Sequence, residues 1–418
     1  MCKIVVPNSV FLNPKFFLTL FAGFIVYFYV YAPPFKAIPF GTDKPILLAS
    51  MVYITYKKRW MNLYILFQKE FFFLFGIVFL SLFVSVIHRI DTSLLLYDIL
   101  LLLECIPTSY FLFCIFRSWN LKHIDNIIIY TAIIGAIIST YLLINPELTY
   151  YIKTILLKYP EHLIDRFLYR GYGISDGLLF SYPVIQGFCF SFILINVGGK
   201  SNLFFKTSLL FLFVAVFSNA RSGFVSICVA FILMLLYDKR SLFLRLLFPF
   251  LILLMLLSGT VSVLLEKNEM LNMSLEWAKT SLDIFSDFIK GEESENVSAL
   301  LNDMIVLPSS IDEWLIGNGK NIFLDACNNS DIGYFIRLKY GGIIYLTVWI
   351  FFCIYMFKRL YKLNKGIALI LFISLVYLNY KGDFFIVNPG SRFFFLIYSL
   401  IVIDSTLFLN SINKKANS

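Results

Sequence analysis

Long runs of apolar residues dominate the chain, and the short polar connections between them carry most of the lysines and arginines. A helix needs about 17–25 mainly apolar residues to cross a hydrocarbon core of about 30 Å. The pattern therefore predicts an all-α fold, a polytopic transmembrane bundle of about twelve spans. The predicted spans are residues 16–33, 43–56, 70–87, 93–116, 126–145, 177–197, 203–218, 221–237, 246–265, 338–357, 366–380 and 393–410.

The composition excludes a soluble domain. Of the 418 residues, 59% are hydrophobic and only 15% are charged, and the mean hydropathy is +0.81. A typical globular domain is roughly half apolar and a quarter charged, and one water-soluble fold cannot bury so large an apolar fraction. We expect residues 1–418 to form a single integral membrane domain. The first apolar run lacks a convincing small-residue cleavage site, so we interpret it as a retained helix.

The net charge of +9 reflects membrane topology, because the positive residues stand in short clusters between apolar runs. Cytoplasmic connections of membrane proteins carry an excess of Lys and Arg. With the N-terminus in the cytoplasm, the cytoplasmic segments hold 19 such residues, and the four short loops on the other side hold six. The bias predicts that both termini are cytoplasmic, and it removes the reason to expect a nucleic-acid partner.

Two long connections, residues 146–176 and 266–337, fall on the outer face in this topology. The second is acidic, with thirteen Asp and Glu against five Lys and Arg. Connections of this length are usually functional or disordered, and aromatic residues such as Trp277 and Trp314 favour order. We therefore expect the function of the protein to lie on the outer face.

The segment Ser218-Asn-Ala-Arg-Ser-Gly223 divides one apolar stretch into two helices at the outer face. Ser218 or Asn219 would cap the second helix and leave backbone N–H groups and the positive end of its dipole exposed there. Arg221 adds a guanidinium whose geometry suits phosphate. The segment is thus a candidate anion site; the alternative is a tight hairpin whose arginine only reaches toward lipid headgroups.

The first long connection ends in Arg166-Phe-Leu-Tyr-Arg170-Gly-Tyr172-Gly173-Ile-Ser-Asp176. Two arginines four apart share one face of a helix, and the glycines allow a close turn. Apolar residues upstream, from Leu148 to Phe167, predict an interfacial helix lying on the bilayer. Arg166 and Arg170 are candidates for substrate phosphate; the alternative is that they anchor this helix to anionic lipid.

The second long connection closes with Gly317-Asn-Gly319 and then Asp331-Ile-Gly-Tyr334-Phe-Ile-Arg337, before the next span. Asp331 is a candidate carboxylate at the membrane mouth, and its alternative role is to cap that span. Lys381 and Arg392 frame the last outer loop and would extend a basic rim.

Asp98 and Glu104 lie inside the fourth predicted span. An acid at the centre of a membrane helix costs roughly 2.5–3.5 kcal/mol on insertion scales, so it usually serves a purpose. Pairing with a buried arginine and catalysis remain equally open. The chain has no Walker loop, HExxH motif or metal-ligand spacing among its seven cysteines, so we predict neither a cofactor nor a metal.

These elements resemble the O-antigen polymerases of the Wzy type. The similar segments are SNARSGF, RFLYRGYG, the run GNGKNIF…NNSDIGYFIRLKYGGI, and the ending K-x-D…SRFFF. The layout of spans and outer loops is similar over the whole chain, and the motifs cover some 50 residues of it.

The resemblance implies glycosyl transfer at the outer face of a bacterial inner membrane, with undecaprenyl diphosphate as the leaving group. Preorganised positive donors would stabilise the charge that develops on the diphosphate, and a carboxylate would act as base on the acceptor hydroxyl. The candidate catalytic residues are Arg221, Arg170, Asp176 and Asp331. The candidate substrate-binding residues are Arg166, Tyr172, Tyr334, Arg337, Lys381 and Arg392. The implied partners are the lipid-linked oligosaccharide, membrane lipid, and the flippase and chain-length regulator of the same pathway.

Two other functions fit parts of the pattern. An O-antigen ligase has a similar layout but is expected to use a histidine in its large outer loop, and residues 266–337 contain none. A transporter or lipid-linked oligosaccharide flippase often shows internal repeats and a substrate site at the membrane midplane. We find no such repeat, so polymerase remains the preferred hypothesis.

Overall fold

The computed structural model describes residues 14–89, 92–121, 124–159, 173–176, 181–196, 203–219, 222–236, 273, 304–322, 330–384 and 386–416. Helices make up nearly all of this part of the chain, and no strand occurs in it beyond an isolated bridge between Phe35 and Leu157. Helices satisfy their backbone hydrogen bonds internally, which is what a lipid environment demands. The all-α prediction is confirmed.

The chain forms two compact units, one made of residues 1–44 and 125–292 and the other of residues 45–124 and 293–418. The division does not test whether both belong to one membrane domain, so that expectation stays a prediction. We describe the two units separately.

Unit 1 is built from α1 (Pro14–Val30), α6 (Ile124–Ile144), α7 (Pro146–Tyr151), η2 (Ile152–Leu156), α9 (Ser181–Asn196), α10 (Leu203–Phe217) and α11 (Ser222–Leu236). Helix α9 packs on both α10 and α11. A Cβ on Gly187 would lie 2.1 Å from the carbonyl oxygen of Gly223, so the backbones of α9 and α11 approach each other too closely for any side chain. Small residues at such contacts are typical of helix pairs in membranes.

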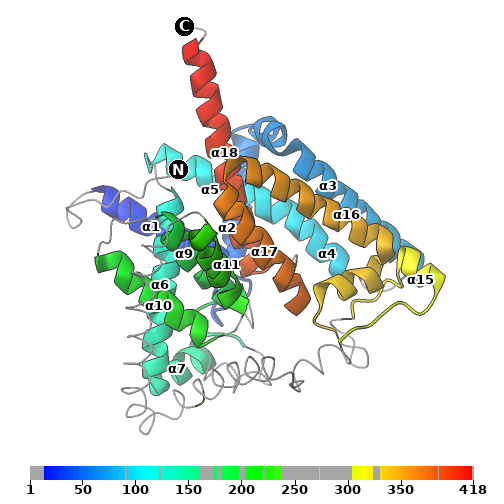
Figure 1. Cartoon of the computed structure of the whole chain (residues 1–418), viewed down its shortest axis with the longest axis horizontal. Coiled ribbons are helices and arrows are strands. Elements are labelled where there is room, and N and C mark those ends of the chain that lie inside the picture. The colour runs from blue at the N-terminus through cyan, green and yellow to red at the C-terminus, as the bar shows by residue number, and fades with distance from the viewer. Residues whose placement is uncertain are drawn as a thin grey trace. The chain divides into compact units, whose positions relative to one another are not determined.

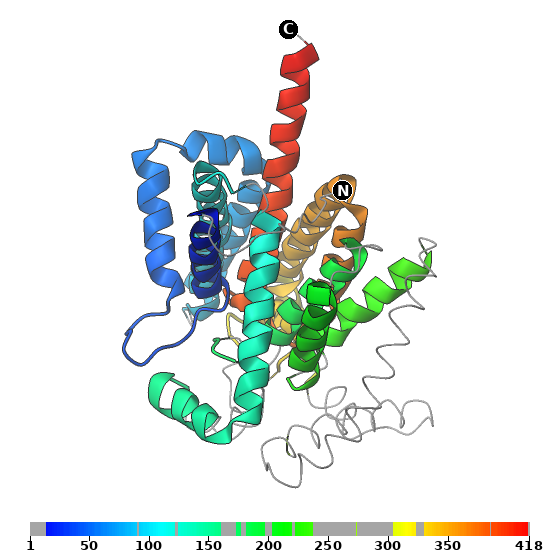
Figure 2. The same cartoon turned by 90° about the vertical axis from the view of Figure 1, so that its left-hand side faces the viewer.

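A short helix follows α6, where the sequence predicts an interfacial helix. Helix α7 and the π-helical turn η2 together cover residues 146–156, and Figures 1 and 2 show α7 turning away from the end of α6. Leu148, Tyr150, Ile155 and Leu156 are exposed on it. An exposed apolar face on a short helix is what an interfacial position requires. The rest of the predicted helix, to Phe167, lies outside the described residues.

Unit 2 contains α2 (Asp43–Tyr56, from Pro45 on), α3 (Trp60–His88), α4 (Ser93–Leu100), η1 (Leu101–Cys105), α5 (Ile106–Ser118), α15 (Ile311–Ile316), α16 (Gly333–Leu363), α17 (Lys365–Lys381) and α18 (Pro389–Ala416). Helices α3 and α16 run side by side, and α16 also packs on α15 and α17 (Figure 1). Pro107 has no N–H to donate, and the π-helical turn η1 immediately precedes it.

The connections of unit 2 gather at two ends. At one end Asn321, before α16, donates a 3.0 Å hydrogen bond to the Ser93 hydroxyl at the start of α4. At the other end Arg117, in the last turn of α5, pairs with Asp404 of α18 at 2.8 Å, and α18 continues past this end (Figure 1). We call these the Asn321 end and the Arg117 end.

Buried ion pairs join helices across unit 2. Glu70 of α3 accepts hydrogen bonds from Arg359 of α16 and from the Tyr398 hydroxyl of α18. Glu104 in η1 accepts a 2.6 Å bond from Nε of Arg392 in α18. Both glutamates are fully buried. A charge within a membrane helix is tolerated when it is paired in the bundle interior, so the pairing alternative holds for Glu104.

Within the described residues, four helices are long and apolar enough to cross a membrane, namely Trp60–His88, Ser93–Ser118, Asn126–Ile144 and Gly333–Leu363. Shorter apolar helices cover Phe17–Val30, Ser181–Ile195, Thr207–Phe217 and Ser222–Leu236. The chain thus fits a helical membrane protein. The four candidate spans within the described residues are fewer than the predicted number of about twelve. Every predicted span within the described residues contains a helix, and residues 246–265 lie outside them.

Two predicted boundaries need correction. Helix α16 begins at Gly333, so the second long connection ends at residue 332 and Arg337 lies inside a helix. Polar residues in the first turns lowered the hydropathy there without interrupting the helical hydrogen bonds. Helix α3 begins at Trp60 and has a break at Phe67, where φ is −125° and ψ is 28°; the predicted span, from residue 70, matches the part after the break.

Candidate functional site

The first turns of α16 pack against the segment that follows α17. A Cβ on Gly333 would lie 2.9 Å from the Cα of Asp383 and 3.0 Å from the carbonyl oxygen of Gly382, so only glycine fits this contact. Residues 330–342 are thereby brought against the K-x-D segment, residues 381–383. Both segments hold predicted site residues, and in the fold they adjoin.

Arg337 is the centre of a buried charge cluster at this contact. Its Nη2 lies 3.0 Å from both carboxylate oxygens of Asp383, and its Nε lies 3.2 Å from one of them. Its Nη1 donates to the Tyr345 hydroxyl at 3.2 Å and lies 3.6 Å from Asp98. The guanidinium also stacks 4.1 Å from the ring centre of Trp349. We call Arg337, Asp383, Asp98, Tyr345 and Trp349 the Arg337 cluster.

The cluster is closed to solvent, since the side chain of Arg337 is 2% exposed and those of Asp98 and Asp383 are 0% and 5% exposed. Tyr345 donates its hydroxyl hydrogen to Asp98. The guanidinium of Arg337 thus binds two carboxylates, those of Asp98 in α4 and of Asp383 just after α17. Bidentate arginine–carboxylate pairs are strong and geometrically specific, so these contacts favour a role for Arg337 in holding the helices over direct contact with substrate.

A break in α16 lets residues on both sides of it enter the cluster. Gly342 has φ 69° and ψ −171° and divides the helix into two segments. Figure 1 shows a short first segment beside α15, set at an angle to the long second segment. Arg337 belongs to the first segment and Tyr345 to the second. The Gly341-Gly342 pair in the sequence was a signal for this break.

We predict that Gly342→Ala destabilises unit 2 by at least about 1–3 kcal/mol, the usual cost of a residue held in a disfavoured backbone conformation. A Cβ there would also lie 2.3 Å from the carbonyl oxygen of Leu315. Gly76→Ala in α3 is the matched control, because nothing lies within 4 Å of its Cβ position; it should be neutral or stabilising. Thermal unfolding in detergent measures both, and equal unfolding temperatures would contradict the prediction.

The Gly317-Asn-Gly319 segment also has a structural explanation. Both glycines have φ 73°, and a Cβ on Gly317 would lie 2.2 Å from the carbonyl oxygen of Tyr340. The N–H groups of Asn318 and Gly319 donate to the carbonyl oxygens of Lys339 and Tyr340 at 2.8 Å and 3.0 Å. The segment therefore lies as backbone against the first segment of α16.

Glu313 fixes α15 at the same place. Ser310 caps α15 by accepting from the Glu313 N–H at 3.2 Å, and the Glu313 carboxylate accepts from the Ser309 N–H and hydroxyl at 2.7 Å and 2.8 Å. Lys339 pairs with that carboxylate at 3.2 Å. The bonds from Ser309, with further help from Lys339 and Asn318, lower the pKa of Glu313 to about 2. The carboxylate therefore stays charged at neutral pH.

Three more predicted site residues, Asp331, Tyr334 and Lys381, lie close to the Arg337 cluster. Tyr334, in the first turn of α16, donates to the carbonyl oxygen of Val376 at 3.0 Å and lines, with Arg337, a small cavity of about 90 Å³. Burial raises the pKa of Asp331, and the positive charge of Lys381 opposes that shift. Asp331 does not cap α16, because the cap position is Ile332.

Arg392 lies apart from this rim, since it is buried and paired with Glu104. The prediction that it extends a basic rim at the membrane mouth does not fit this position. Arg392 lies in the first turn of α18 beside the buried Glu104, so it pairs with that carboxylate and does not reach solvent. Pairing of Glu104 with a buried arginine was one of the two predicted alternatives, but no local pattern identified Arg392 as the partner, because the two residues are 288 positions apart.

In unit 1 the predicted break between helices is present, because α10 ends at Phe217 and α11 begins at Ser222. The Ser218 hydroxyl and the Asn219 amide donate to the carbonyl oxygens of Val214 and Ala215, which closes the end of α10. The sequence predicted that one of these two residues, Ser218 or Asn219, would cap α11, whereas their side chains bond to carbonyl groups of α10. Arg221 itself lies outside the described residues, as do Arg166, Arg170 and Tyr172.

Asp176 is exposed, and its backbone N–H donates to the carbonyl oxygen of Tyr31 at 2.7 Å. Beside it, Tyr27 donates its hydroxyl to the carbonyl oxygen of Ile174 at 2.7 Å. The end of the first long connection is therefore tied to α1 and to the residue after it.

Among the described residues, no three His, Cys, Asp or Glu side chains are grouped so that they could hold a metal ion. Comparison with models of known protein families gives no match, and neither curated proteins nor solved structures give one. The fold and its apolar helices fit the class of helical membrane proteins.

Proposed function

We propose that this protein is a membrane glycosyltransferase that polymerises lipid-linked O-antigen repeat units during lipopolysaccharide synthesis. The observation that supports it best is the meeting of two family-like segments, because Arg337 of the FIRLKYGG run is paired with Asp383 of the K-x-D segment. Asp331, Tyr334 and Lys381 lie at the same end of unit 2. Polar side chains thus collect where the topology derived from loop charge expects the outer face.

In the proposed reaction the acceptor hydroxyl, at the non-reducing end of one lipid-linked repeat, attacks the anomeric carbon of the growing chain. The bond between that carbon and the diphosphate oxygen breaks, and undecaprenyl diphosphate leaves. Asp176 or Asp331 takes the proton from the hydroxyl. Arg221 and Arg170 stabilise the negative charge on the leaving diphosphate. Arg166, Tyr172 and Tyr334 bind the substrate.

The proposal includes about twelve spans, both termini in the cytoplasm, and a location in the bacterial inner membrane. The buried Arg337 and Arg392 would then act by holding the helices that carry the exposed residues. The flippase and the chain-length regulator of the pathway would be its partners. No nucleic acid is involved.

Topology reporters test this arrangement. We expect fusions at Lys58, Lys239 and Lys358 to report cytoplasm, and fusions within residues 146–176 and 266–337 to report periplasm, because of the charge bias of the loops. A cytoplasmic signal from either long connection would contradict the proposed site.

Deleting the gene tests the function itself. We expect lipopolysaccharide with core plus a single repeat unit, because one unit can still be transported and ligated without polymerisation. A gel of the lipopolysaccharide ladder measures this, with the intact gene restored on a plasmid as the control. Loss of every repeat would favour a ligase or flippase instead, and an unchanged ladder would exclude all three.

A further inference from the structure

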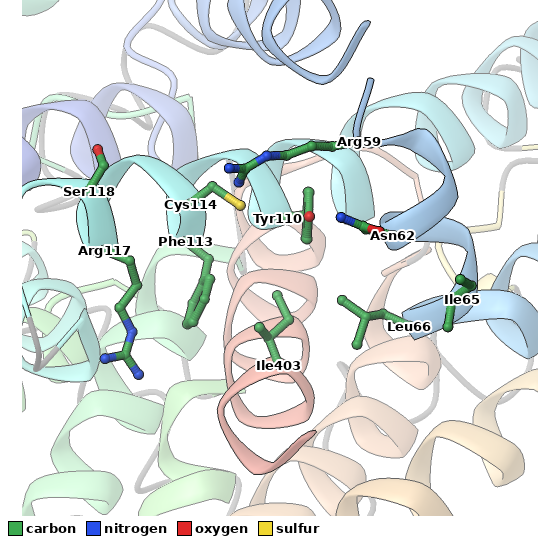
Figure 3. A pocket seen from close by; sticks show the side chains of 10 residues that line it. All are labelled: Arg59, Asn62, Ile65, Leu66, Tyr110, Phe113, Cys114, Arg117, Ser118 and Ile403. Atoms are coloured by element: carbon green, nitrogen blue, oxygen red, sulfur yellow. The ribbon is translucent and has the colours of Figure 1, made fainter. Parts of the chain in front are cut away.

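A large open pocket lies at the Arg117 end of unit 2, away from the Arg337 cluster. Its volume is about 850 Å³, within the range of about 300–1,000 Å³ typical of ligand pockets. It is formed by the start of α3, the second half of α5 and the middle of α18 (Figure 3). The lining residues are Arg59, Asn62, Ile65, Leu66, Tyr110, Phe113, Cys114, Arg117, Ser118 and Ile403.

Two arginines stand at this pocket. Arg59 precedes α3 and reaches toward Cys114 and Tyr110 of α5, whereas Arg117 lies one turn beyond Phe113 on the same helix (Figure 3). Asp404 occupies one guanidinium nitrogen of Arg117 and orients the group. A guanidinium carries five N–H donors, so a phosphate oxygen can bind beside that carboxylate.

One wall of the pocket is apolar and opens toward the surface that would face lipid, whereas Asn62 and Ser118 add polar groups to the rest of the lining. Ile65, Leu66, Phe113 and Ile403 line it, and Ile65 is 66% exposed. Exposed Trp60 and Met61 continue this surface at the start of α3. Apolar walls contribute nothing to the binding of a soluble anion, whereas a lipid has both a charged headgroup and an apolar chain that such walls can contact.

We propose that this pocket binds the phosphate headgroup of an anionic phospholipid between Arg59 and Arg117, with an acyl chain along Ile65 and Leu66. Basic pockets between membrane helices near the cytoplasmic surface are suited to such headgroups. The proposal does not rest on glycosyl transfer, since only lipid binding is invoked. The bound lipid would join α3, α5 and α18 at an end where the described ion pair is exposed.

Lipid titration of the purified full-length protein, followed by native mass spectrometry, tests the site. We expect phosphatidylglycerol to bind more tightly than phosphatidylcholine. The Arg59→Gln/Arg117→Gln variant should bind phosphatidylglycerol roughly 25- to 30-fold more weakly, because each basic residue near a headgroup contributes about a factor of five. Asn62→Asp, a change on an exposed side chain, should weaken binding without removing either arginine.

The matched control is Lys57→Gln/Lys362→Gln, which removes the same charge from exposed residues of the same end that do not line the pocket. It should keep the preference for phosphatidylglycerol. An equal loss of phosphatidylglycerol binding in both double variants would mean general surface attraction and would overturn the proposal. An unchanged preference for phosphatidylglycerol in the arginine variant would overturn it as well. Competition by millimolar inorganic phosphate would indicate a site for a soluble anion and would also contradict the proposal.

Discussion

Replacing Arg337 by alanine is expected to destabilise the protein by about 3–5 kcal/mol, because it leaves Asp98 and Asp383 buried without their common partner. The total stability of a folded domain is only about 5–15 kcal/mol. We therefore expect Arg337→Ala to be strongly reduced in the membrane and to unfold at a clearly lower temperature in detergent. Immunoblotting of membranes and thermal unfolding measure the two effects.

Arg337→Lys separates charge from geometry. Lysine keeps the positive charge but loses the two-pronged contact with Asp383, so an intermediate loss is expected. The matched control is Lys362→Ala on the same helix, because Lys362 is exposed and a surface substitution usually changes stability by no more than about 0.5 kcal/mol. A normal amount of Arg337→Ala protein that unfolds like the parent, yet makes no polymer, would mean that Arg337 serves the substrate instead.

Arg221→Ala is expected to abolish long polysaccharide chains while the protein still inserts normally. Arg221 belongs to the break between α10 and α11, where a helix start and a fixed positive charge would face the lipid diphosphate. Removing one preorganised donor of this kind typically costs about 2.7–4 kcal/mol of transition-state stabilisation, or roughly 100- to 1000-fold in rate. Arg221→Lys should give shorter chains, because the charge remains and the fork is lost.

The lipopolysaccharide ladder on a gel reports chain length, with the membrane level of each variant matched by immunoblot. Arg89→Gln is the control, since Arg89 is an exposed arginine after α3 that the charge bias places on the same face. It should make a full ladder. If Arg221 only reaches toward headgroups, both of its variants will polymerise like the parent, since one surface anchor contributes little.

The positions of the helices were predictable because they depend on local sequence. An apolar run of sufficient length forms a helix whatever it packs against. Irregularities occur next to residues with special backbones, as in the π-helical turn before Ile106-Pro107 and the break at Gly342. Helix ends were less predictable. Arg337 and Lys339 made the start of α16 look like part of a loop, because hydropathy falls at polar residues even where the helical hydrogen bonds continue.

The candidate site was predictable only in part. Sequence patterns selected Asp331, Tyr334 and Arg337 from one segment and Lys381 from another, and the fold brings them to one end of unit 2. The sequence patterns did not distinguish residues that face solvent from residues that hold helices together. The same residue type serves both purposes, and burial decides between them.

By itself the sequence determined that the chain is helical, apolar and suited to a membrane, because composition and the lengths of apolar runs suffice for those conclusions. Only the tertiary structure decided which charges are paired. Arg359 meets Glu70 across 289 positions, and Arg392 meets Glu104 across 288. Pairs so distant in the chain leave no local pattern, and they form because a charge inside an apolar bundle is stable only beside its opposite.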